Sequence, residues 1–95
     1  MLTESDLTRL AQSFPSLEGA PGADPWNPHA LDGWALSSGE ATRAAAHAAR
    51  FCLAVSNPAA GWLCGPFDFH AAYQEWRSPD RDAFLEWAND PQWGG

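Results

Sequence analysis

The sequence predicts one compact all-α domain over residues 1–95, with about five helices packed around a central alanine-rich helix at about 38–56. Alanine, the strongest helix former, occurs 18 times. Isoleucine is absent and Val55 is the single valine, whereas strands depend on β-branched residues. Proline and glycine also divide the chain into segments of helical length. We therefore expect about 50–65% helix by circular dichroism, well above the usual third.

The first helix is predicted over residues 4–14, with Thr3 as its N-cap. Its apolar residues recur at i, i+3, i+4 and i+7, which is the spacing of one helical face. These residues are Leu7, Leu10, Ala11 and Phe14. Residues 15–26 are rich in proline and glycine, so we expect a loop there.

The second and third helices follow from their capping residues. Asn27 and Pro28 are typical of a helix start, and Leu31, Trp34 and Ala35 form the apolar face of this second helix. A capping box of Ser37 and Glu40 is expected to open the third helix, and Asn57-Pro58 to end it near Ser56. Apolar residues cover most of the circumference of the third helix, which is typical of a helix in the middle of a bundle. Its small residues include Ala41, Ala44, Ala45, Ala46, Ala48 and Ala49.

The last two helices are expected to supply the bulk that a small-residue helix requires from its neighbours. Asp68 is the predicted N-cap of the fourth helix, and Ser78-Pro79 begins the fifth, which ends before Pro91. The side chains predicted to face the core are Phe69, Ala72, Tyr73 and Trp76 on the fourth helix, and Phe84, Trp87 and Ala88 on the fifth.

Charge excludes several classes of function. The chain has 12 acidic residues, 5 arginines and no lysine, so its net charge is −7. Such a chain does not displace counterions from nucleic acid, and it is repelled by anionic membranes. No run of apolar residues is long enough to span a membrane, and the acidic N-terminus does not resemble a signal peptide. We therefore expect a cytoplasmic protein whose Cys52 and Cys64 are reduced.

Metal binding and catalysis have little support in the sequence. The three histidines and two cysteines lack the short paired spacings of zinc sites, so no metal or other cofactor is predicted. No phosphate-binding loop or nucleophile motif is present, and we predict that the protein is not an enzyme. The alternative is a small hydrolase or redox enzyme that uses Cys64 as nucleophile and His70 as base.

A positive stripe lies on the central helix, where Arg43, His47 and Arg50 stand at i, i+4 and i+7. Arginine binds phosphate and carboxylate groups in a bidentate manner, so the stripe is a candidate anion-binding site. The alternative is that these residues form the solvent-exposed edge of the helix or pair with acids on neighbouring helices.

Two further features are candidates for partner binding. Asp82, Glu86 and Asp90 are spaced by four on the fifth helix, about 6 Å apart along its axis. This acidic row is either an ordinary solvated face or a mimic of the regularly charged nucleic-acid backbone. Tryptophan is common in binding hot spots as well as in cores. The residues that lie outside the periodic segments are Trp26, Trp62 and Trp93.

These observations favour a small acidic protein-binding module whose partner is another protein, in particular a basic one that binds nucleic acid. In size and acidity the chain is similar to phage-encoded inhibitors of host defence, including anti-CRISPR proteins, although it shares no motif with them. That similarity implies inhibition by nucleic-acid mimicry. The other alternative is a bacterial accessory protein that dimerises, and both a monomer and a homodimer fit the composition.

Overall fold

The computed structural model describes residues 2–36 and 42–94, about 61% of which are helical, with no strand among them. The predicted all-α architecture with five α-helices is confirmed, and a short 3-10 helix is added after the first of them. The elements are α1 (Glu4–Gln12), η1 (Pro15–Leu17), α2 (Pro28–Leu36), α3 (Arg43–Ser56), α4 (Phe69–Glu75) and α5 (Ser78–Asn89).

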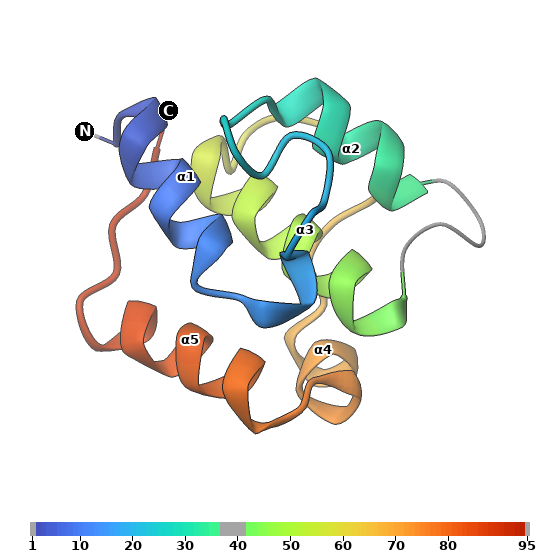
Figure 1. Cartoon of the computed structure of the whole chain (residues 1–95), viewed down its shortest axis with the longest axis vertical. Coiled ribbons are helices and arrows are strands. Elements are labelled where there is room, and N and C mark those ends of the chain that lie inside the picture. The colour runs from blue at the N-terminus through green and yellow to red at the C-terminus, as the bar shows by residue number, and fades with distance from the viewer. Residues whose placement is uncertain (1, 37–41, 95) are drawn as a thin grey trace.

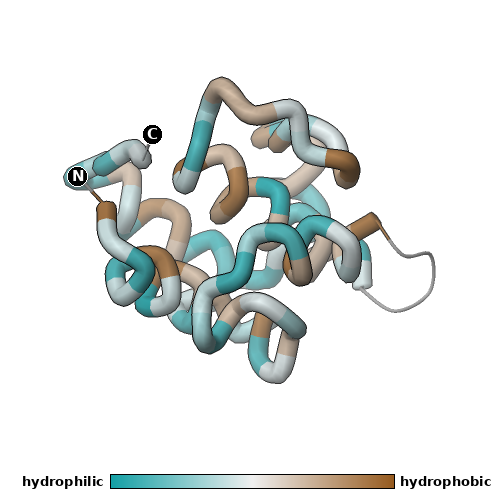
Figure 2. Tube along the Cα trace, turned by 90° about the horizontal axis from the view of Figure 1, so that it is seen from above, coloured by the Kyte–Doolittle hydropathy of each residue, from teal (hydrophilic) through white to brown (hydrophobic). Residues whose placement is uncertain are grey.

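Helix α3 lies in the middle of the fold, with the other helices arranged around it (Figure 1). It packs against α1, η1, α2 and α4. The alanines of α3 allow these close approaches, and Ala48 and Ala49 are fully buried. The C-terminal segment returns to the end of α3, where Gly94 donates its N–H to the carbonyl of Val55 at 2.7 Å. The segments next to the two chain ends lie near each other in both views (Figures 1 and 2).

The start of α3 differs from the prediction. The helix begins at Arg43, and Thr42 is its N-cap, with Oγ1 accepting a hydrogen bond from the N–H of Ala45 at 3.1 Å. A threonine at this position satisfies one of the N–H groups that the first helical turn leaves without a partner. The predicted capping box of Ser37 and Glu40 lies outside the described residues.

The segment between α1 and α2 was predicted to be a loop, and it is packed into the core. The predicted loop, residues 15–26, contains η1 and four buried side chains, those of Leu17 in η1 and of Ala20, Ala23 and Trp26 after it. Gly22 has φ +85°, and a side chain there would lie 2.6 Å from the N–H nitrogen of Leu31. The carbonyl of Gly22 accepts the N–H of Asn27 at 2.8 Å. Asn27 in turn caps α2 through the N–H of Ala30, as predicted.

An aromatic cluster around Phe51 joins α3 to both C-terminal helices. The Phe51 ring lies 4.9–5.6 Å from those of Phe14, Phe67, Phe84 and Trp87, measured between ring centroids. Trp76 lies in the same cluster and donates its Nε1–H to the carbonyl of Ala44 at 3.1 Å. The predicted pairing of a small-residue helix with aromatic neighbours is confirmed.

Three side chains predicted to face the core are exposed. On α4, Ala72 and Trp76 are buried, whereas Phe69 is 49% and Tyr73 is 37% exposed. Within α4 Ala72 is the buried residue, and the C-cap residue Trp76 contacts α3 through the carbonyl of Ala44. On α5 the inward row is Asp80, Ala83, Phe84 and Trp87. Ala88 follows Trp87 by about 100° of helical rotation and is exposed.

Hydrophilic and hydrophobic residues are mixed along the described part of the trace (Figure 2). No helix in the described ranges is both long enough and apolar enough to cross a bilayer.

Candidate functional site

The predicted acidic row lies on the outer side of α5. Asp82, Glu86 and Asp90 are all exposed, because the opposite side of the helix packs on the aromatic cluster. Pro79 occupies the first turn of α5, where its fixed φ suits a helix start. Asp90 is the C-cap residue, so the row ends where the helix ends.

A groove of about 250 Å³ runs beside this row, between α1 and α5. The apolar part of its lining includes Leu10 of α1 and Ala83 and Trp87 of α5. Two members of the acidic row, Glu86 and Asp90, also line the groove, whereas Asp82 does not. The groove therefore combines an apolar surface with carboxylates in its lining. The remaining lining residues are Leu2, Asp6, Arg9, Ser13 and Gln92.

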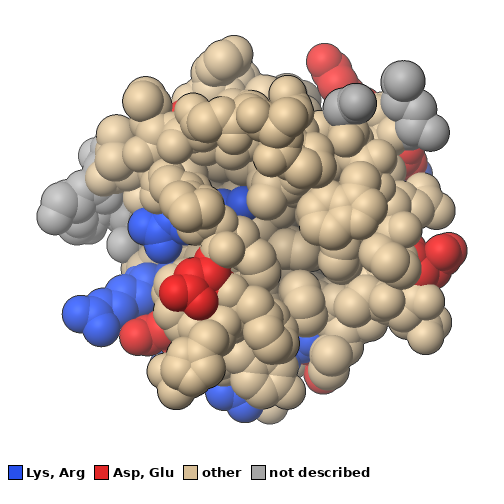
Figure 3. Space-filling model, turned by 180° about the vertical axis from the view of Figure 1, so that it is seen from behind, with Lys and Arg blue, Asp and Glu red and all other residues tan. Residues whose placement is uncertain are grey.

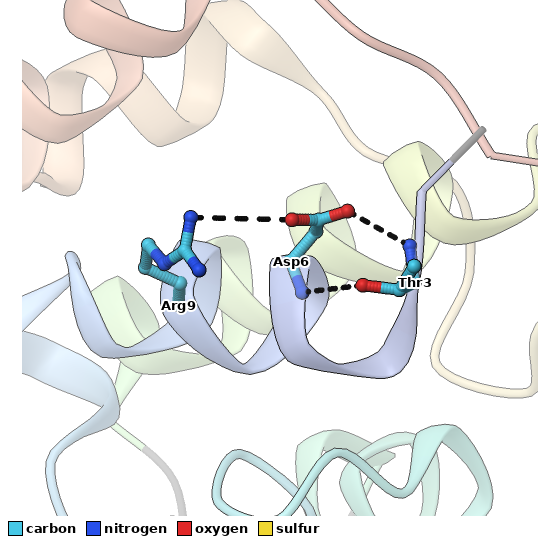
Figure 4. Close-up of polar contacts among 3 residues, drawn as sticks. All are labelled: Thr3, Asp6 and Arg9. Atoms are coloured by element: carbon cyan, nitrogen blue, oxygen red, sulfur yellow. Dashed lines mark hydrogen bonds and ion pairs between the residues drawn. The ribbon is translucent and has the colours of Figure 1, made fainter.

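The α1 side of the groove is shaped by a local capping arrangement (Figure 4). Thr3 Oγ1 accepts the N–H of Asp6, and Asp6 Oδ2 accepts the N–H of Thr3 at 2.9 Å, which completes a capping box. These hydrogen bonds lower the pKa of Asp6. Its other oxygen, Oδ1, lies 4.0 Å from Arg9 Nη1, on the same side of α1 (Figure 4). Asp6 therefore interacts mainly within its own helix.

Glu86 and Asp90 have no such partners. Within residues 2–36 and 42–94, neither carboxylate forms an ion pair or a side-chain hydrogen bond. Both lie at the C-terminal end of α5, whose last turn contains no basic residue. The partial negative charge of a helix C-terminus adds to theirs, so this end of the groove attracts cations.

The three candidate tryptophans have different surroundings. Trp93 is 54% exposed and lies edge-on to Trp87, with 5.0 Å between ring centroids. Trp62 is half-buried and donates its Nε1–H to the carbonyl of Leu53 at 3.1 Å. Trp26 is only 7% exposed and belongs to the core. Trp93 is therefore the candidate that joins the acidic face, and Trp26 presents little surface to a partner.

The predicted positive stripe on α3 is largely engaged within the protein. Arg43 Nη1 lies 3.4 Å from Glu75 Oε1, and Arg50 donates its Nε–H to the carbonyl of Cys64 at 2.8 Å. Burial, together with Arg50, lowers the pKa of His47, which favours its neutral form. The rear face shows basic and acidic side chains next to one another on its left side (Figure 3). An anion-binding role for the stripe stays a prediction, and it rests chiefly on the exposed Arg43.

Cys64 and His70 do not have the properties of an activated pair. Cys64 is buried, and this burial, together with the neighbouring Asp32 carboxylate, raises the pKa of the Cys64 thiol to about 12. A nucleophilic cysteine requires a lowered pKa. His70 is exposed on α4 and lies beside Gln74. Burial likewise raises the pKa of Cys52.

We expect Cys64 to react with iodoacetamide at neutral pH at least about 100-fold more slowly than a free cysteine, because little thiolate is present. Mass spectrometry of the labelled protein over time measures the rate, and labelling in concentrated denaturant is the control that shows both thiols to be available. Rapid alkylation of Cys64 in the folded protein would contradict its burial. It would also favour the alternative of a hydrolase or redox enzyme that uses this thiol.

No group of three or more histidine, cysteine or acidic side chains is arranged to hold a metal ion within the described part of the chain. This is a statement about geometry among those residues, and the cofactor prediction itself stays a prediction.

Two buried acids were missed by sequence reasoning. Asp32 is 5% exposed, and its two oxygens accept the N–H groups of Leu63 at 3.0 Å and Cys64 at 2.9 Å. Asp80 is equally buried and accepts the N–H of Ser16 at 3.2 Å. Asp32 thereby attaches the loop before α4 to α2, and Asp80 attaches η1 to α5. The position of Asp32 on the same face of α2 as Leu31 and Ala35 indicated that it is buried. Its charge, however, is typical of an exposed residue, so the sequence analysis did not place it in the core.

The chain matches no protein-family model, and no curated protein and no solved structure is significantly similar to it.

Proposed function

We propose that this protein binds a basic partner protein through an acidic face that consists of Asp82, Glu86, Asp90 and Trp93. The observation that carries the proposal is the pair of unpartnered carboxylates, Glu86 and Asp90, at the C-terminal end of α5. Trp93, which contacts Trp87, extends this face with exposed aromatic surface of the kind found in binding hot spots.

The partner that we propose is a protein whose own basic surface binds nucleic acid. Support comes from the net charge of −7 and from the row of carboxylates on one side of α5. A negative face complementary to a positive one accelerates association and disfavours neutral partners. By occupying a surface that otherwise contacts phosphates, the protein acts as an inhibitor of nucleic-acid binding.

Neutralising the acidic face is expected to slow association with such a partner. In a variant with Asp82→Asn, Glu86→Gln and Asp90→Asn, the association rate is expected to fall and to depend less on salt, because electrostatic steering is screened within a Debye length of about 8 Å. The variant is expected to be no less stable, since like charges at a helix C-terminus are removed. The partner is first isolated from a lysate of the source organism as the protein that this chain retains. Biolayer interferometry over a salt series then measures the association rate and its dependence on salt.

The matched control neutralises three acids elsewhere, with Glu4→Gln, Glu18→Gln and Asp24→Asn, so that both variants have the same net charge. These three acids are exposed and do not lie on α5. If both variants bind at the same rate and with the same salt dependence, the effect is one of overall charge and the acidic face is an ordinary solvated surface. If the protein self-associates and retains no other protein, the dimerising alternative is favoured.

A further inference from the structure

The groove between α1 and α5 has the dimensions and lining of a subsite for one side chain. Its volume of about 250 Å³ compares with about 30 Å³ for a water molecule in the liquid, so it has room for a long side chain. Leu10 and Ala83 supply aliphatic surface, and Trp87 supplies an aromatic ring. An occupant therefore needs an apolar stem.

The carboxylates in this lining require the far end of that occupant to be positive. Glu86 and Asp90 line the groove and have no ion pair in the described chain, and the C-terminus of α5 adds partial negative charge. Arg9, the one cation in the lining, lies beside Asp6 on α1, and its side chain is 80% exposed. The two α5 carboxylates are therefore left for an external cation.

We propose that this groove binds a single arginine side chain of the partner, an inference that rests on the proposed function and makes it more specific. The alkyl stem of the arginine packs against Leu10 and Trp87, and its guanidinium reaches Glu86 and Asp90. Arginine satisfies both requirements, because its stem is apolar while its planar head binds carboxylates in a bidentate manner and lies well against aromatic rings. Lysine lacks the planar head.

The experiment titrates the protein with the blocked tripeptide acetyl-Gly-Arg-Gly-amide and follows the indole N–H signals by NMR. The arginine peptide is expected to shift the Trp87 signal saturably, whereas the same peptide with uncharged citrulline is not. Glu86→Gln is expected to weaken the binding about tenfold, the size of one charge-assisted hydrogen bond. Glu18→Gln is the matched control, because it makes the same substitution at an exposed acid that lies outside both the groove and the acidic face, and it is expected to change the affinity less than about twofold.

The outcomes separate the subsite from the proposed function. Equal weakening by Glu18→Gln and Glu86→Gln would overturn the subsite, since the peptide would then respond to the net charge of the protein, and the proposed function would stand. Equal binding of the citrulline peptide, or of a lysine peptide, would overturn the assignment to arginine. If the peptide does not bind but the triple variant still loses the partner, only the subsite fails. If the triple variant also keeps the partner, both fail.

Discussion

Replacing Phe51 by alanine is expected to destabilise the protein by about 3–5 kcal/mol, because the substitution leaves a cavity in the centre of the aromatic cluster. Phe51 is 2% exposed, and its ring contacts Phe14 at the start of η1, Phe67 in the loop before α4, and Phe84 of α5. The neighbouring rings are held by separate elements, so they cannot close the cavity by a movement of one helix. For a domain of this size the loss is a large part of the total stability.

Urea unfolding followed by circular dichroism measures this loss, provided that the slope of the transition is unchanged. The control is Phe69→Ala, the same substitution at an aromatic residue that is 49% exposed on α4. Its cost is expected to be below about 1 kcal/mol, since it leaves no closed cavity. Similar losses for the two variants would mean that the cluster around Phe51 is not the centre of the core.

Asp32→Asn is expected to destabilise the protein by about 2–4 kcal/mol, although the two side chains are nearly isosteric. Both oxygens of Asp32 accept backbone N–H groups, those of Leu63 and Cys64. An asparagine has one oxygen, so its amide group would face one of these N–H donors and leave it without an acceptor. Asp80→Asn is the matched control, since Asp80 accepts a single N–H, from Ser16, which an asparagine oxygen still accepts. Its expected cost is about 1 kcal/mol or less.

The difference in stability between the wild type and Asp32→Asn is expected to depend on pH. Burial raises the pKa of Asp32, but the hydrogen bonds from Cys64 and Leu63 outweigh it, and the net shift lowers this pKa below 3.8. A lowered pKa in the folded state gives stability that is present above the unfolded-state value and is lost as the pH falls through the folded-state value. The stability gap between the wild type and Asp32→Asn is therefore expected to be constant near neutrality and to narrow below about pH 4. A gap that stays constant into that acidic range would contradict the role of the charged carboxylate.

Much of the fold was predictable, because helix positions depend on local signals. Thr3, Asn27 and Asp68 cap α1, α2 and α4 as predicted, and Pro79 lies in the first turn of α5. A cap depends on residues within one turn, so it can be read without knowledge of the neighbours. The predicted start of α3 was wrong. Ser37 and Thr42 are both residue types that cap helices, and spacing alone does not choose between them.

The candidate site was predictable only in part. The acidic row was visible because a spacing of four places Asp82, Glu86 and Asp90 on one side of any helix. The groove beside it was not, since Leu10 and Trp87 come from helices far apart in the sequence. The exposure of each loop tryptophan also depends on the tertiary path of its loop. Trp26 is covered by the core, whereas Trp93 is exposed.

The sequence by itself therefore determined the helical class, most helix boundaries and the central position of α3, since these depend on composition, capping and periodicity. Only the tertiary structure decided which face of each helix is buried and to what depth. Phe69 and Ala88 lie outside the core, whereas Asp32 and Asp80 lie within it. The physical reason is that burial of an individual side chain depends on the surfaces that meet it. A buried carboxylate is stable where the fold brings backbone N–H groups within hydrogen-bonding distance, and those groups come from segments distant in the sequence.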